Sequence, residues 1–372
     1  PNARVHTFHR FMPYDVFYEK NPEYYALRNG KRLPTQLCLT NNAVLEIVKD
    51  SVRSFFKSSP ISDVISVSQD DNTQYCQCEN CSKIDNNEGS PAGSLIHFVN
   101  EIAKDFPDKT ISTLAYQYTR KPPKTKPLEN VLITLCSIEC DRSIPIDEGC
   151  KDFSSDLKGW SILTDNIRIW DYTTQFTNFL APFPNWGTIK PNINLFVQNN
   201  AKWIFEQHSR NDSELFELRS YVMAKLLWDP SLNFNTLIKD FNDKYYGDGG
   251  KYITEYISKI QSQIDNTSFF LFLYGDPSQG FDSFLSPQNL SNYDKLFDKA
   301  LSKVDYNSNY YNRILRSKIS IDYAILELYR KNFSDLYKLT FYENSLKKIN
   351  PELTKRLNNF RDVCSENNIT YM

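Results

Sequence analysis

Short apolar stretches alternate with segments of helical periodicity along the first two thirds of the chain, and this alternation constrains the fold most. Stretches of strand length, rich in β-branched and aromatic residues, occur at residues 4–11, 64–69, 110–116, 131–138, 167–172 and 202–206. Near-continuous apolar runs of this kind are typical of buried parallel strands. Helical segments with start signals follow Thr40, Ser90-Pro91 and Ser213-Glu214. The sequence therefore predicts an α/β fold with a parallel sheet and helices outside it.

The pattern favours a (β/α)8 TIM barrel, in which the six visible strands would be the third to the eighth. We expect the first two strands to lie upstream of this chain or to be missing from it. The connection at 119–130 is rich in Pro and Lys, so it is expected to be a loop. After Asp229-Pro230 the pattern predicts helices alone, over 234–245, 252–264, 289–304, 309–330 and 335–364.

The Gly-rich turn at 247–250 predicts a division of the chain at that point, because glycine does not continue a helix readily. We expect residues 1–247 to form the catalytic portion of the barrel and residues 248–372 to form an α-helical C-terminal domain.

Composition and missing motifs exclude several classes of function. The net charge of the 372 residues is −2, and no cluster of Lys and Arg marks a site for nucleic acid or an anionic membrane. No apolar run reaches the roughly 20 residues that span a bilayer. The chain also has no Gly-rich phosphate loop, no GxSxG elbow and no HExxH pair. We therefore expect no nucleotide chemistry, no serine hydrolysis, no cofactor and no catalytic metal.

Carboxylates follow three of the expected strands, at the barrel end where reactive groups gather. Asp70 and Asp71 follow one strand, Glu139 follows a second, and Glu206 ends a third. Cleavage of a glycosidic bond needs a proton donor and a second polar group beside the developing positive charge, which paired carboxylates supply. The alternatives stay open: Asp70-Asp71-Asn72 is also good turn chemistry, and Glu139 could pair with a nearby arginine.

Other strand ends carry residues suited to sugar binding. His9 and Tyr116 end two strands, and a third ends in Trp170-Asp171-Tyr172. Trp186 follows in a Pro-rich loop and is expected to be the better stacking platform, since Trp170 fits a barrel core equally well. Aromatic residues make up 14% of the chain, which agrees with sugar stacking or with an aromatic core.

The eight cysteines include a cluster and a close pair. Cys76, Cys78 and Cys81 resemble part of a zinc knuckle without its fourth ligand, which a distant residue such as Cys38 or Cys140 could supply. A disulfide, or free thiols that pin the loop, is the favoured interpretation, and no metal site is assigned. Cys140 and Cys150 could bridge a short loop.

Motifs in the same order along residues 6–247 resemble a known family, the domain of unknown function 4838, which belongs with glycoside hydrolase family 163. The motifs are the three cysteines named above together with HTF at 6–8, NPEYY at 21–25, QLCLTN at 36–41, SVSQDDN at 66–72, LAYQY at 114–118, IECDR at 138–142, WDY at 170–172, PFPN at 182–185 and LLWDP at 226–230.

This resemblance implies an endo-β-N-acetylglucosaminidase that acts on complex N-glycans and retains stereochemistry by using the substrate's own 2-acetamido oxygen as nucleophile. Asp70 would orient the acetamide and Asp71 would donate the proton, with Glu139 as rival acid and Glu206 as third choice. Position 70 is Asp where the family pattern is expected to read Asn. The resemblance also implies a glycan or glycoprotein partner and a secreted, periplasmic or cell-surface location, and it leaves the oligomeric state open.

Two other functions stay open at this point. An exo-acting glycosidase resembling α-glucuronidases would need a basic pocket, which Arg10 or Arg142 could supply. A non-catalytic carbohydrate-binding protein would need only the aromatic loop.

Overall fold

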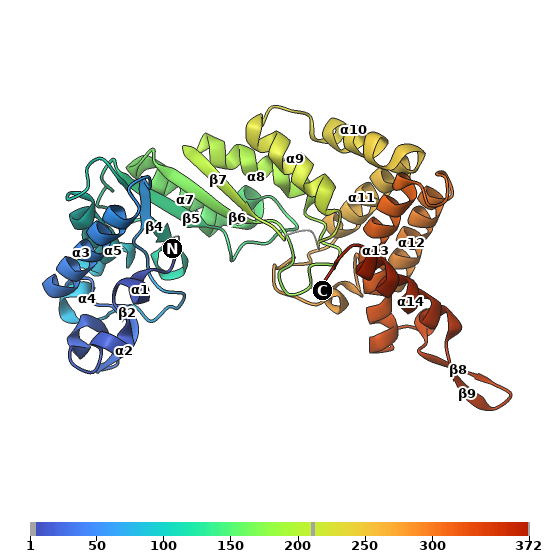
Figure 1. Ribbon diagram of the computed structural model, residues 1–372, viewed down its shortest axis with the longest axis horizontal. Coiled ribbons are helices and arrows are strands. Elements are labelled where there is room, and N and C mark those ends of the chain that lie inside the picture. Colours follow the sequence, from blue (N-terminus) through green and yellow to red (C-terminus); the bar gives the residue numbers. More distant parts are fainter. Residues whose placement is uncertain (1–4, 210–212, 371–372) are drawn as a thin grey trace. The chain divides into compact units, whose positions relative to one another are not determined.

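The computed structural model describes residues 5–209 and 213–370 (Figure 1). These residues divide into two compact units. The first comprises Pro1–Ser137, Lys151–Asp171 and Phe196–Phe205, and the second comprises Ile138–Cys150, Tyr172–Leu195 and Glu206–Met372. The chain thus passes between the two units several times before the helical C-terminal part begins.

Five strands form one sheet in chain order, β3 (Val64–Ser66), β4 (Thr110–Ala115), β5 (Val131–Cys136), β6 (Ile167–Tyr172) and β7 (Ala201–Gln207). β3 to β6 pair in parallel, with Ile111 opposite Val131 and Ile133 opposite Ile167. Every residue of β5 is buried, as its unbroken apolar run requires. Figure 1 shows β4 to β7 side by side in this order. Five of the six expected strands and the α/β class are therefore confirmed.

The strand expected at residues 4–11 is wrong. Phe8–Phe11 forms the short helix α1, and the backbone N–H groups of Thr7 and Phe8 both donate to the carbonyl oxygen of Ser68, at 3.0 and 3.2 Å. In a β-ladder the N–H groups of one strand bond successive carbonyl oxygens of its neighbour, so two N–H groups that share one carbonyl oxygen do not continue the ladder. The segment thus lies beside the chain that follows β3 without becoming a strand. The described residues form an open five-stranded sheet, and they do not form the closed eight-stranded barrel.

The helices that follow the first strands begin close to their expected starts. α3 spans Asn42–Ser58, and the side chain of Asn41, rather than Thr40, caps it by accepting from the N–H groups of Ala43 and Val44. The other helices of this part are α2 (Tyr14–Phe17), α4 (Glu79–Glu88), α5 (Ala92–Ala103), α6 (Ile146–Gly149), α7 (Lys151–Leu163) and α8 (Trp186–Gln198). Of the loop expected over 119–130, residues 120–130 contain no helix and are confirmed, while Thr119 ends a short 3-10 turn at Gln117–Thr119.

An antiparallel hairpin between α1 and α3 was not anticipated. Its strands are β1 (Tyr25–Arg28) and β2 (Lys31–Leu37), and the two-residue turn between them has φ angles of 48° at Asn29 and 75° at Gly30. Asn-Gly is the preferred sequence for such a turn because both positions have positive φ. This dipeptide was the signal in the sequence that could have revealed the hairpin.

Helices dominate the C-terminal part, namely α9 (Phe216–Trp228), α10 (Phe234–Tyr246), α11 (Gly250–Asp265), α12 (Pro287–Leu301), α13 (Asn309–Lys331) and α14 (Pro351–Glu366). The helix expected over 335–364 is wrong at its start. A hairpin of β8 (Thr340–Glu343) and β9 (Leu346–Ile349) precedes α14, with positive φ at Asn344 and Ser345 in its turn. Among the described residues, no helix combines the length and the apolar character that crossing a membrane requires.

Candidate functional site

The loop that carries Asp70 and Asp71 leaves the sheet at the carboxyl end of β3. Beyond β3 the chain stays extended and buried through Gln69, and the N–H of Val67 still bonds the carbonyl oxygen of Ser112 at 2.8 Å. The carboxyl edge of a parallel sheet is where α/β proteins commonly bind ligands. The two aspartates therefore stand where the sequence places them, although the sheet around them is open.

Gln36, at the end of the β1–β2 hairpin, holds the backbone of this loop. Its amide oxygen accepts from the N–H of Asp70 at 3.0 Å, and its amide nitrogen donates to the carbonyl oxygens of Asp70 and Asn72 at 2.7 and 3.0 Å. Gln36 is almost fully buried, so these bonds are protected from water. Sequence reasoning missed this role, because the partners are 34 residues or more apart.

The carboxylate of Asp70 is bound by His9 and is largely shielded. The ring Nδ1 of His9 lies 2.6 Å from Asp70 Oδ1, and the backbone N–H of His9 lies 3.1 and 3.2 Å from the two carboxylate oxygens. The side chain of Asp70 is 16% exposed, whereas that of His9 is 59% exposed. Helix α1, which replaces the expected strand, thus fixes Asp70 and leaves the His9 ring at the surface.

Asp71 is exposed and has a different partner. The hydroxyl of Tyr116, just beyond β4, donates to Asp71 Oδ1 at 3.0 Å, and the side-chain amide of Gln117 donates to the same hydroxyl at 2.9 Å. The structure therefore brings together His9, Asp70, Asp71 and Tyr116, four of the residues that the sequence predicts for the site.

Backbone strain accompanies this group. Gln117 has φ of 50°, and His6, whose ring lies 6.0 Å from that of Tyr116, has φ of 52°. Residues other than glycine adopt a backbone with positive φ at a cost in free energy, and such residues concentrate at functional sites. We therefore regard the loop of Asp70 and Asp71 as the best candidate site in the first unit.

A stacked aromatic pair lies near Asp70. The rings of Tyr75 and Tyr118 are 4.6 Å apart and nearly parallel. Burial raises the pKa of the Tyr118 hydroxyl, and the negative charge of Asp70 raises it further. Neither tyrosine was predicted, although Tyr118 follows Tyr116 by two residues in the turn after β4.

Trp170 and Asp171 belong to the first unit and are committed to other contacts. The ring of Trp170 meets that of Phe205 edge to face at 5.1 Å. Asp171 is buried and accepts a hydrogen bond from the hydroxyl of Ser137. The sugar-binding roles of these two residues stay predictions.

Glu139, Glu206, Tyr172 and Trp186 belong to the second unit. Glu139 is exposed and precedes Cys140, which forms a disulfide with Cys150, a pairing that the sequence left open, while Glu206 is half-buried in β7. Tyr172 is buried, and the guanidinium of Arg142 lies 5.7 Å from its ring.

The prediction that Trp186 is a stacking platform is contradicted by its burial. Trp186 is 2% exposed at the start of α8, and the guanidinium of Arg219 covers its ring at 4.0 Å. The Pro-rich loop turns this ring inward, so it offers no face to a sugar.

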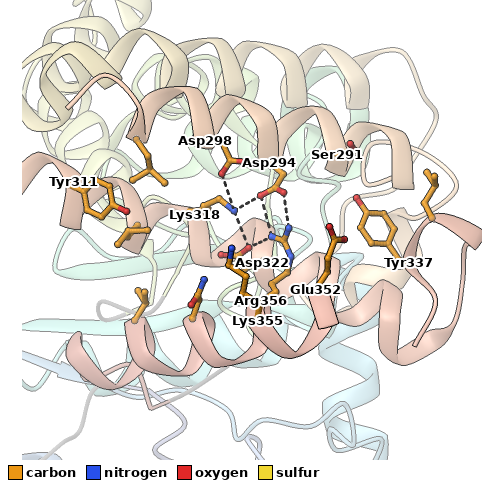
Figure 2. Close-up of a pocket in the computed structure, with 15 residues that line it drawn as sticks. Ser291, Asp294, Asp298, Tyr311, Lys318, Asp322, Tyr337, Glu352, Lys355 and Arg356 are labelled. Atoms are coloured by element: carbon orange, nitrogen blue, oxygen red, sulfur yellow. Dashed lines mark hydrogen bonds and ion pairs between the residues drawn. The ribbon is translucent and has the colours of Figure 1, made fainter. Parts of the chain in front are cut away.

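A pocket of about 600 Å³ lies among α12, α13 and α14 (Figure 2). Lys318 contacts Asp294 and Asp322, and Arg356 contacts the same two carboxylates. Burial alone would raise the pKa of Asp294, but bonds and charges from Arg356 and Lys318 lower it below its ordinary value. These charges neutralise one another and join three helices. No residue of the predicted site lines this pocket, so we do not assign catalysis to it.

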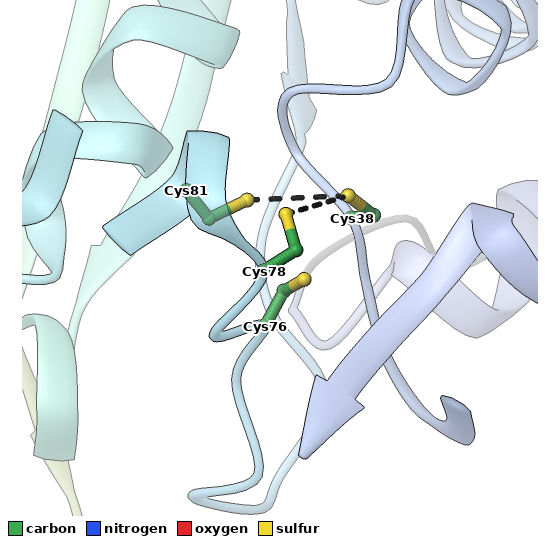
Figure 3. Close-up of side chains that lie close together, drawn as sticks. All are labelled: Cys38, Cys76, Cys78 and Cys81. Carbon is green, nitrogen blue, oxygen red and sulfur yellow. Dashed lines mark hydrogen bonds between the residues drawn. The ribbon is translucent and has the colours of Figure 1, made fainter. Parts of the chain in front are cut away.

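Four cysteines of the first unit form one group that could hold a metal ion. The sulfur atoms of Cys38, Cys76, Cys78 and Cys81 all lie within 4.8 Å of one another (Figure 3). All four are free thiols. Within the described residues this is the one such group of His, Cys and acidic ligands.

The fold and the site define an α/β protein with two adjacent aspartates at the carboxyl edge of a parallel sheet. The chain belongs to the family described as domain of unknown function (DUF4838), whose model matches residues 1–258. Among solved structures, a mutant O-GlcNAc hydrolase from Thermobaculum terrenum is similar at 12% sequence identity and a TM-score of 0.43, over 89% of this chain and 71% of that chain. No curated protein matches the chain.

Proposed function

We propose that the chain is a glycoside hydrolase that cleaves β-linked N-acetylglucosamine within complex N-glycans, with retention and with assistance from the substrate's 2-acetamido group. The observation that carries this proposal is the contrast between two adjacent carboxylates. Asp70 is shielded and fixed by His9, while Asp71 is exposed and bonded to Tyr116. A fixed polar group beside an accessible one supplies the two roles that such a reaction needs.

In this mechanism Asp71 gives its proton to the glycosidic oxygen as the bond from that oxygen to C1 breaks. The acetamide carbonyl oxygen attacks C1 at the same time and forms a cyclic oxazolinium intermediate. Asp70 accepts a hydrogen bond from the acetamide N–H and so aligns the carbonyl oxygen. Asp71 then removes a proton from water, which adds to C1 and restores the acetamide, so the acid is regenerated with retained stereochemistry.

The neighbouring residues support these roles by position. His9 and Gln36 hold the carboxylate and the backbone of Asp70, so the carboxylate needs little reorganisation when substrate binds. The hydroxyl of Tyr116 orients Asp71. We propose Glu139, and after it Glu206, as the alternative acids.

The decisive experiment is release of glycan from a complex-type N-glycoprotein, analysed by mass spectrometry. We expect a cut between the two core N-acetylglucosamines. Asp71→Asn should lower kcat/KM by about 10²- to 10⁴-fold, because the proton transfer is lost. It should lose far less on a nitrophenyl glycoside, whose leaving group needs no proton. Asp70→Asn should keep more activity than Asp70→Ala, because an amide oxygen can still accept from the acetamide.

Asp108→Asn is the matched control, since Asp108 is exposed and lies outside the site. Loss of glycan release in Glu139→Gln together with full activity in Asp71→Asn would move the acid to Glu139. Binding of the glycan without any release by the unaltered chain would contradict the enzyme and favour a carbohydrate-binding protein.

We also propose a secreted, periplasmic or cell-surface location. The disulfide between Cys140 and Cys150 supports it, because structural disulfides persist mainly in oxidising compartments. Fractionation of expressing cells, with detection of the intact disulfide, tests this location.

A further inference from the structure

We propose that Cys38, Cys76, Cys78 and Cys81 bind one zinc ion as a structural centre. This site is separate from the proposed chemistry and does not depend on it. Figure 3 shows the four side chains turned toward a common point from three segments, namely the residue after β2, the loop before α4, and the first turn of α4. Sequence reasoning found three of these ligands and named Cys38 as one of two candidates for the fourth.

The distances match a tetrahedral site. The sulfur of Cys38 lies 3.7 Å from that of Cys78 and 4.0 Å from that of Cys81. At a Zn–S bond of about 2.3 Å, the thiolates of a tetrahedron are about 3.8 Å apart. Four cysteines that only packed against one another would have no reason to turn all four sulfur atoms toward one point.

Hydrogen-bond donors and a positive charge lie beside the cluster. The N–H of Leu27 donates to Cys76 at 3.3 Å, and the guanidinium of Arg32 lies 3.9 Å from the same sulfur. Cys78 and Cys81 stand at the N-terminus of α4, where helix N–H groups stabilise a negative charge. Four thiolates around Zn²⁺ carry an excess of negative charge, which these donors offset.

Little regular structure surrounds the four cysteines. Between β3 and α4 the chain has no helix or strand in residues 67–78, and the small buried cluster at this place consists of Ala26 and three of the cysteines. A metal ion would join the β1–β2 hairpin to this loop. Gln36 precedes Cys38 by two residues and bonds the backbone of Asp70, so the metal ion would also help to fix the loop of Asp70 and Asp71.

Redox chemistry of the chain also favours metal over disulfides. Cys140 and Cys150 are bonded, while the four clustered cysteines are free thiols. In an environment that oxidises the first pair, four neighbouring thiols with sulfur atoms this close together would oxidise too unless a metal held them. Uptake of one Zn²⁺ by four thiols releases four protons and needs no oxidant.

The test is the metal content of the full chain purified without chelators. We expect one zinc per chain by mass spectrometry of the metal, and Co²⁺ exchange should give the visible bands of a tetrahedral four-thiolate complex. Cys38→Ser should lose the metal. Cys364→Ser, a matched change outside the cluster, should retain it. Cys78→His should retain the ion but shift the Co²⁺ bands, which distinguishes ligand exchange from misfolding.

Two results would overturn the proposal. One is a reduced, folded chain that takes up neither Zn²⁺ nor Co²⁺. The other is equal metal content in Cys38→Ser and the unaltered chain. Titration of thiols in the denatured, chelated protein should find six free thiols. A count of two, with two disulfides mapped within the cluster, would show instead that these cysteines form disulfides.

Discussion

At the scale of single residues, folding buries the acidic side chain of Asp85 and so disfavours its charged form. It lies in α4, 8% exposed, and its carboxylate accepts from the N–H of Ser94 at 2.9 Å in the first turn of α5. Burial raises its pKa from 3.8 to about 6, although the bonds from Ser94 oppose the shift. The protonated form is therefore favoured in the folded protein.

This shift predicts a pH dependence of stability. Because the folded pKa exceeds the unfolded one, the stabilising contribution of protonated Asp85 is complete below about pH 4 and is lost as the pH rises through about 6. Ionisation of Asp85 should therefore lower the free energy of unfolding by on the order of 2–3 kcal/mol. Asp85→Asn should abolish this pH-dependent decrease, because an amide does not ionise. Urea unfolding across this range measures it. An Asp85→Asn variant with the same pH slope as the unaltered chain would refute the shift.

At the scale of elements, a buried ion pair joins the Pro-rich loop before α8 to α9 and α11. Arg219 and Glu214 meet at 2.6 Å, each 2% exposed. Arg219 also donates to the carbonyl oxygen of Phe183, and the hydroxyl of Tyr256 donates to the other oxygen of Glu214. Every one of these groups is satisfied by a partner from another segment, so the pair couples the Pro-rich loop to two helices.

Removal of one partner of this ion pair should therefore strongly lower the free energy of unfolding. Arg219→Met should lower the free energy of unfolding by about 3–5 kcal/mol, because it leaves the charge of Glu214 buried without its partner. The double change with Glu214→Leu should cost less than Arg219→Met alone. Chemical unfolding compares them with Lys259→Met in α11, whose exposed pair with Glu255 should contribute under about 1 kcal/mol. Equal losses for Arg219→Met and Lys259→Met would show that the buried pair is not structural.

At the scale of the whole molecule, the proposed division at residue 247 can be examined through the contacts that cross it. The hydroxyl of buried Tyr246 lies 2.8 Å from that of Ser317, and Tyr256 beyond the division bonds Glu214 before it. The family model itself extends to residue 258, within α11. These contacts join the C-terminal helices to the residues before them.

We therefore expect residues 1–247 expressed alone to lack a stable fold, because the fragment loses the Tyr256 hydroxyl that bonds buried Glu214 and the Ser317 hydroxyl that pairs with buried Tyr246. Limited proteolysis and near-ultraviolet circular dichroism should show rapid cleavage and weak tertiary signal beside the full chain. A protease-resistant fragment with cooperative unfolding would instead establish 247 as a true domain boundary.

Much of the secondary structure could be predicted because it depends on neighbours in sequence. The period of apolar residues located five strands and most helices, and proline located the loop at 120–130. Local patterns failed at residues 4–11, where a short apolar run fits a strand or a helix equally well. The missed hairpin had a local signal in Asn29-Gly30, and the burial of Trp186 had none.

By itself, the sequence determined the α/β class, the adjacent aspartates at the end of β3 and three members of the cysteine cluster. Each depends on residues within a few positions of one another. Only the tertiary structure decided that Gln36 holds Asp70, that Cys38 completes the cluster, and that the sheet is open. These depend on contacts between residues 34 or more positions apart, whose formation is governed by the packing of whole elements rather than by local preference.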